Sequence, residues 1–196
     1  MNVNKKEKIE TQVKKIFEDN ECMHIYEHSV NVAKQAQSIA KQYHMPDEKV
    51  YLAGLLHDIG GIYPNEKRVD MARQFHIELF DEEIQFPLII HQKLSKYLAQ
   101  HEFGIDDEIV LSSIECHTTL KENYTQEDLI VFLADKIAWD QKGEPPYLKE
   151  LLQSMNSSLE EASLYYIEYI LSHNIKVIHP WLAKARLSLK QNIKNT

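Results

Sequence analysis

YLAGLLHDIG, residues 51–60, is the stretch that decides the fold, because it joins an apolar helix to a histidine and an aspartate. Pro46 suits the first turn of this helix, and Gly60 suits its end. We therefore expect His57 and Asp58 in the last turn. An ionised aspartate beside such an apolar run is costly to bury unless it meets a cation or strong hydrogen bonds. The pair is a candidate metal-binding element.

A second histidine lies on the preceding predicted helix, residues 24–43. His28 is followed at steps of three and four by Val32, Ala36, Ile39 and Tyr43, so it continues the apolar stripe of that helix. The spacing predicts that His28 faces inward. Taken alone, it fits an ordinary half-buried histidine as well as a metal ligand.

A second aspartate lies in a still more apolar setting. Asp135 falls in the middle of the predicted helix TQEDLIVFLADKIAWD, residues 125–140, which is apolar on nearly every side. A carboxylate there needs a metal, or a partner such as Lys136 or a buried arginine. Both readings stay open at this point.

The rest of the chain predicts an all-α fold of about nine helices in a single domain, residues 1–196. The sequence has only five glycines and six prolines, and no linker divides its 196 residues. Residues 20–140 would form the core around the metal site, and helices within 147–194 would complete the bundle. Further helices are expected near 5–19, from a cap at Asn65, near 87–101, 106–117, 147–154 and 158–173, and from Pro180 onward.

Composition excludes several classes of protein. No apolar run is long enough to span a membrane, and the start MNVNKKEKIE lacks the apolar stretch of a signal peptide, so we expect a cytoplasmic protein without membrane contact. Cys22 and Cys116 are too few for a disulfide framework. A net charge of −8 argues against nucleic acid as a partner, but it permits a small phosphorylated or nucleotide substrate in a local pocket.

The order H…HD…D makes the set more specific than any of its members. His57 follows His28 by 29 residues, and Asp135 follows Asp58 by 77. Imidazole and carboxylate together suit iron, manganese or zinc rather than calcium. The sequence therefore predicts a divalent metal held by His28, His57, Asp58 and Asp135.

This pattern resembles the HD-domain superfamily of metal-dependent phosphohydrolases. IYEHSVNVA, AGLLHDIG, His91, ECHTT at 115–119 and FLADKI at 132–137 are most similar to the bacterial HD-domain family that cleaves diadenosine tetraphosphate symmetrically to two ADP. The resemblance covers about residues 20–140. It implies iron as the metal, with manganese, cobalt or zinc as alternatives. It also implies a phosphate site lined by His57, His91, His117, Thr118 and Asp135. His91 and His117 would either contact phosphate or complete a second metal position.

The chain departs from that family where cations are usual. Ile25, Gly61 and Gln141 stand at places that usually hold arginine, lysine and arginine, and Leu120 replaces a common glycine. Lys136, beside a predicted ligand, and Arg186, in a region of nucleotide contacts, are the expected substrate-binding cations. Other candidate replacements are Lys67, Arg68, Arg73 and Lys121.

The leading hypothesis is hydrolysis of a dinucleoside polyphosphate. The predicted catalytic residues are Asp58 and Asp135 as proton acceptors, with His91 and His117 as donors to phosphoryl or leaving oxygens. A phosphatase acting on another small ester, such as a nucleoside monophosphate, would need fewer cations. A non-catalytic module that binds metal and nucleotide is the third reading. The sequence leaves monomer and homodimer equally open.

Overall fold

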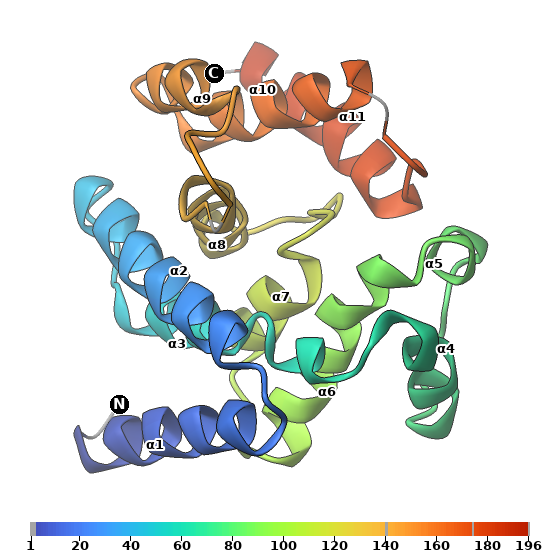
Figure 1. Cartoon of the computed structure of the whole chain (residues 1–196). Helices are drawn as coiled ribbons and strands as arrows, with labels where there is room; N and C mark the ends of the chain where they lie inside the picture. Colours follow the sequence, from blue (N-terminus) through green and yellow to red (C-terminus); the bar gives the residue numbers. More distant parts are fainter. Residues whose placement is uncertain (1–2, 140, 174, 196) are drawn as a thin grey trace.

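The computed structural model describes residues 3–139, 141–173 and 175–195, and within them it is all-α, as predicted (Figure 1). These residues form eleven α-helices and two short 3-10 helices, close to the expected nine. The α-helices are α1 (Val3–Asp19), α2 (Met23–Gln42), α3 (Glu48–Leu56), α4 (Asn65–Gln74), α5 (Asp81–Gln85), α6 (His91–His101), α7 (Glu108–Cys116), α8 (Gln126–Ile137), α9 (Leu148–Met155), α10 (Leu159–Ser172) and α11 (Pro180–Asn195). The 3-10 helices are η1 (Ile59–Ile62) and η2 (Pro87–Ile90).

The centre of the molecule is formed by α2, α3, α6, α7 and α8. Helix α2 packs against both α3 and α8, α7 contacts α3, α6 and α8, and η1 lies against α6. The C-terminal helices α9 to α11 form a separate layer, in which α10 packs on α8 (Figure 1). The main hydrophobic cluster runs through both parts, from Val32 on α2 through Phe132 on α8 to Ile167 on α10. One core therefore joins the layers.

A glycine on α3 brings this helix close to α2. A Cβ atom added to Gly54 would lie 2.8 Å from the Cα of Ala33, a distance that real side chains avoid. Because only a hydrogen fits there, the two backbones approach closely. The end of α3, where the HD pair follows, is thereby held beside the helix that carries His28.

Helix α8 is held in register by its N-cap. Thr125 accepts a hydrogen bond from the Asp128 amide, and the Asp128 carboxylate accepts one from the Thr125 amide. Such a capping box satisfies amides that the first helical turn leaves unpaired. The same buried carboxylate accepts hydrogen bonds from Ser112 and Ser113 on α7. Helix α7, which is followed directly by His117, is thus tied to α8, which carries Asp135.

Several predicted boundaries near the site were wrong. Helix α3 ends at Leu56, so His57 and Asp58 follow its last turn, and Asp58 has already left the helical conformation at φ −108° and ψ 12°. Asp135 lies in the last turn of α8 rather than its middle. Both aspartates, which are predicted metal ligands, therefore lie at helix ends, and the side chains of His57 and Asp58 can converge there as they could not within a continuous helix.

Other boundaries also differ from the sequence expectation. His91 is the first residue of α6, because the turn opened by Pro87 is the separate 3-10 helix η2. Asn65 is the first residue of α4 and makes no cap hydrogen bond, Pro46 precedes the start of α3, and α5 was missed. Such ends are decided by tertiary contacts more than by local propensity.

Two further sequence expectations concern membrane-spanning helices and the cysteines. Among the described residues, no helix is long and apolar enough to cross a membrane. Both cysteines are free thiols, and Cys116 is buried. Neither takes part in the cluster described below.

Candidate metal and phosphate site

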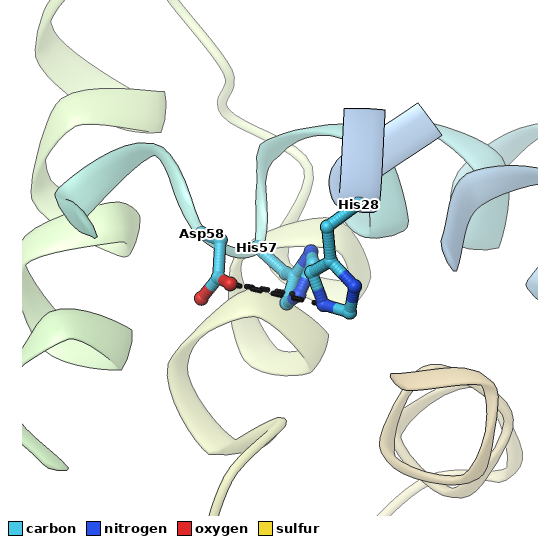
Figure 2. A group of neighbouring side chains, drawn as sticks. All are labelled: His28, His57 and Asp58. Carbon is cyan, nitrogen blue, oxygen red and sulfur yellow. Dashed lines mark ion pairs between the residues drawn. The ribbon is translucent and has the colours of Figure 1, made fainter. Parts of the chain in front are cut away.

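The four predicted metal ligands converge on one point from three elements. Nε2 of His28, on α2, lies 3.0 Å from Oδ1 of Asp135 on α8 and 3.9 Å from Oδ2 of Asp58. Nε2 of His57 lies 3.4 Å from Oδ2 of Asp58 and 3.6 Å from Oδ1 of Asp135. Figure 2 shows His28 reaching toward the HD pair from the neighbouring helix. The fold therefore brings together residues that are 107 positions apart in sequence.

A second group forms on the other side of Asp58. Its Oδ1 atom lies 3.1 Å from Nε2 of His91 and 3.5 Å from Nε2 of His117. Asp58 thus offers one oxygen to the His28–His57 pair and the other to the His91–His117 pair. Each group contains at least three donors close enough together to share an ion. The arrangement would fit either one metal or two, the alternatives that the sequence left open, and Asp58 belongs to both groups.

Three of the imidazoles are oriented in the same way. The Nδ1 atoms of His57, His91 and His117 each lie at hydrogen-bond distance from a backbone carbonyl three residues earlier in the chain. A neutral ring that donates its Nδ1 proton has an unprotonated Nε2 with a lone pair. This is the usual orientation of a metal-binding histidine, in which a second hydrogen bond sets the tautomer. All three Nε2 atoms point into the cluster.

The electrostatics of the carboxylates favour bound cations. Burial alone would raise the pKa of Asp58, but His57, His91 and His117 together hold it well below its ordinary value. Burial likewise opposes ionisation of Asp135, yet Lys136, His28 and His57 lower its pKa well below the usual range. Both carboxylates are therefore anionic at neutral pH. Their side chains keep only 22% and 16% of their exposure, so they need compensating positive charge.

The two buried histidines respond differently to this field. Burial lowers the pKa of His117 to about 4, and its hydrogen bond to Asp58 only partly opposes this, so the ring is neutral at pH 7. Burial also lowers the pKa of His57, but Asp58 and Asp135 outweigh it and raise the value above the ordinary one. His117 is thus ready to act as a lone-pair donor. His57 therefore holds a proton more readily than an ordinary histidine does.

Two further observations test whether a metal fits. Nε2 of His57 is fully buried and makes no hydrogen bond among the described residues, although it faces both carboxylates. Nε2 of His91 and Nε2 of His117 lie 2.9 Å apart, and two lone pairs at that distance repel unless a cation or a proton lies between them. The donor set, two carboxylates and four imidazoles, therefore fits a divalent transition metal.

The remaining predicted site residues divide into two groups. Lys136 forms a salt bridge with Oδ2 of Asp135, so this expected partner of the aspartate is present, while Oδ1 faces the predicted metal ligand His28. Thr118 lies close, with Oγ1 3.2 Å from Nε2 of His91. Arg186, on α11, instead forms two hydrogen bonds with Glu168 and lies outside the pocket described next.

A pocket of about 360 Å³ opens onto the cluster. It is lined by His28, Asp58, His91, Asp135 and Lys136, together with Ile25, Gly61, Arg68, Leu88, Ala138, Trp139, Tyr147 and Tyr166. Ile25 and Gly61, which replace usual cations, form one wall, and a Cβ added to Gly61 would lie 3.0 Å from Cδ1 of Ile25. Gln141, the third such position, is exposed.

The aromatic lining was not identified from the sequence. Tyr147 and Tyr166 fall within helices predicted near 147–154 and 158–173, and their rings meet edge to face with centroids 5.0 Å apart. They come from the C-terminal layer, whose position over α8 no local pattern reveals. Trp139 lies two residues after FLADKI, and this closeness to a predicted ligand was the available signal.

Comparison with known proteins agrees with this geometry. The model of the family described as "HD domain" matches residues 25–140, more than half of the chain. A Lactococcus lactis subsp. cremoris protein, "Uncharacterized protein in pepC 5'region", is 56% identical over 145 residues, 74% of each chain. A Staphylococcus aureus protein named "Bis(5'-nucleosyl)-tetraphosphatase, symmetrical" is 35% identical over 113 residues, 57% of each chain.

A solved structure extends the likeness to the whole fold. The crystal structure of a predicted HD superfamily hydrolase involved in NAD metabolism, from Clostridium acetobutylicum, superposes with a TM-score of 0.84 at 29% sequence identity. The match covers 93% of this chain and 97% of the other. The C-terminal layer is therefore part of the shared fold. This chain belongs to the HD-domain family, and it is a hydrolase of that superfamily.

Proposed function

We propose that this enzyme hydrolyses a dinucleoside polyphosphate, such as diadenosine tetraphosphate, to two nucleoside diphosphates in a metal-dependent reaction. The observation that carries the proposal is the double group of donors around Asp58, which lies at the bottom of a pocket that also presents Lys136 and Arg68. The name of the Staphylococcus aureus relative, a symmetrical tetraphosphatase, supports this choice of substrate.

The metal would be held by His28, His57, Asp58 and Asp135, with His91 and His117 as donors to a second ion if two are bound. Iron is our first choice, and manganese, cobalt or zinc are alternatives. When bound, a divalent metal lowers the pKa of water and neutralises negative charge on phosphoryl oxygens.

The side chains divide the handling of protons between them. Asp58 and Asp135 are ionised, so either carboxylate can accept a proton from the attacking water. His117 is neutral and 1% exposed, which favours a role as lone-pair donor over a role as acid. His91 lines the pocket, and Nε2 of its ring can hold a proton beside Asp58 and donate it to the leaving phosphate oxygen.

The test is a product assay with metal supplied. Protein loaded with iron, manganese or cobalt should convert diadenosine tetraphosphate into two ADP, and EDTA should stop the reaction. Asp58→Asn should lower kcat/KM by about a thousandfold or more, because it removes an anion shared by both donor groups. His101→Asn, on an exposed position at the end of α6, is the matched control and should retain activity. Absence of turnover with all three metals, or release of ATP and AMP, would refute the proposal.

A second candidate function is supported by the shape of the pocket. A volume of about 360 Å³ is near the lower end of the range for ligand pockets, roughly 300–1,000 Å³. Ile25 and Gly61 also leave fewer cations than several phosphates would require. A phosphatase acting on a nucleoside monophosphate or similar ester fits these features. A panel of phosphorylated metabolites would favour it if a monoester is turned over with higher kcat/KM than diadenosine tetraphosphate.

A further inference from the structure

Arg68 is a buried arginine that faces the pocket without a carboxylate partner. It lies on α4, is 9% exposed, and lines the same pocket as Asp58 and His91. The sequence contains three arginines, and the other two form ion pairs, Arg73 with Asp70 and Arg186 with Glu168. Among the described residues, Arg68 forms none. A buried cation without a counterion is costly, so its position invites an anionic ligand.

The guanidinium is held in place by two backbone carbonyls. Its Nε atom donates to the carbonyl of Tyr63 at 2.9 Å, and Nη1 donates to the carbonyl of Leu88 at 2.9 Å. These contacts use two of the five N–H groups of arginine. Because carbonyls carry no net charge, they orient the fork without neutralising it. The positive charge therefore remains available to a ligand.

The Leu88 carbonyl also links Arg68 to the catalytic cluster. This oxygen accepts a hydrogen bond from Nη1 of Arg68, and it also lies at hydrogen-bond distance from Nδ1 of His91. The guanidinium and the His91 imidazole are thus positioned by the same atom. Burial lowers the pKa of Arg68, whereas the negative charges of Asp58 and Glu66 oppose this. The guanidinium is therefore close enough to interact electrostatically with Asp58.

We propose that Arg68 binds a phosphate group of the substrate and replaces the cations missing at Ile25, Gly61 and Gln141. This rests on the proposed function, because it assumes that the pocket takes a phosphorylated ligand. The fork of arginine matches phosphate oxygens in two-pronged geometry. Neither the motifs of the HD pattern nor its spacing points to this position. Only the folding of α4 against η2 turns it toward the ligands.

The first experiment compares ADP binding among variants loaded with Mn²⁺. The Arg68→Met variant should bind ADP about 10- to 100-fold more weakly than the wild type in calorimetry, because it loses charge-assisted hydrogen bonds to phosphate. Arg68→Lys, which keeps the charge but not the fork, should fall between. Arg73→Met, an exposed arginine on the same helix, is the matched control and should bind as wild type does. If Arg68 only holds the two carbonyls, Arg68→Met melts at a lower temperature but keeps the ADP affinity of the control, which overturns the proposal.

The second experiment uses the wild-type chain, in case the variants fold poorly. Phenylglyoxal reacts with arginine, and peptide mass spectrometry can follow all three arginines separately. In Mn²⁺-loaded protein, ADP should protect Arg68 at least several-fold and leave Arg73 unprotected. Equal labelling with and without ADP, or no labelling of Arg68 in free protein, overturns the proposal. If ADP protects Arg68 but no dinucleoside polyphosphate is hydrolysed, the proposed function falls and Arg68 remains an anion-binding residue.

Discussion

Replacing Gly60 by alanine should separate η1 from α6 and disturb the cluster. A Cβ atom at this position would lie 2.6 Å from the carbonyl oxygen of His91, 2.7 Å from the amide nitrogen of Ser95 and 2.9 Å from Cβ of Leu94. Two of these atoms belong to the α6 backbone and cannot move cheaply. The Gly60 amide also donates a hydrogen bond to Oγ of Ser95 at 2.9 Å, which the same displacement would stretch.

The size of the effect follows from two opposing terms. Overpacking costs about 1–3 kcal/mol, whereas glycine-to-alanine exchange restricts the unfolded chain and returns about 0.4–1 kcal/mol. The steric term prevails, so Gly60→Ala should lose about 1–2 kcal/mol. For a chain of 196 residues this lowers Tm by roughly 2–8 °C. Because η1 follows directly after Asp58, the variant should also bind metal less tightly.

The adjacent Gly61 supplies a stability control. There an added Cβ meets only Ile25, with Cδ1 at 3.0 Å, and the end of that flexible side chain can move away. The free energy of unfolding of Gly61→Ala should therefore be within about 1 kcal/mol of that of the wild type, or higher. The assay is thermal melting of both variants by circular dichroism, with metal content measured after gel filtration. Gly60→Ala melting as high as Gly61→Ala would refute the reasoning.

Two further outcomes are expected. Mn²⁺ at about a hundred times its Kd should raise the free energy of unfolding by about 2.7 kcal/mol, which corresponds to a rise of roughly 5–11 °C in Tm. A His28→Asn variant that shows the same rise in Tm would contradict the assigned ligand set. In EDTA, urea unfolding should show stability falling by at most roughly 3 kcal/mol from pH 6.5 to 4, because the folded-state pKa of His117 is about 4 while the unfolded chain takes up its proton near 6.5. The raised pKa of His57 does not cancel this slope, because the stabilisation that His57 provides is lost only as pH rises above 6.5. His117→Asn should flatten the slope between pH 6.5 and 4. An unchanged slope in that variant would count against the burial of His117 as the cause.

Local pattern was sufficient for every described α-helix except α5, and for the metal ligands as candidates. The apolar period around His28 predicted an inward-facing side chain, and that side chain is half-buried against Asp135. Buried carboxylates at Asp58 and Asp135 required cations on energetic grounds alone, and both have basic partners. The precise ends of α3, α6 and α8 were not predictable, because contacts between distant segments decide where these helices stop.

Sequence by itself determined the class of fold, the family and the kinds of side chain available, since these depend on composition, period and spacing along the chain. Tertiary structure alone decided which arginine faces the pocket. Arg186 was expected there and pairs with Glu168 elsewhere, while Arg68 was one of several further candidates that the sequence could not rank, and it is buried beside the cluster. The physical reason is that the type of residue fixes the charge of its side chain. The solvent exposure of that side chain and its counterions depend on helices that meet only in the folded chain.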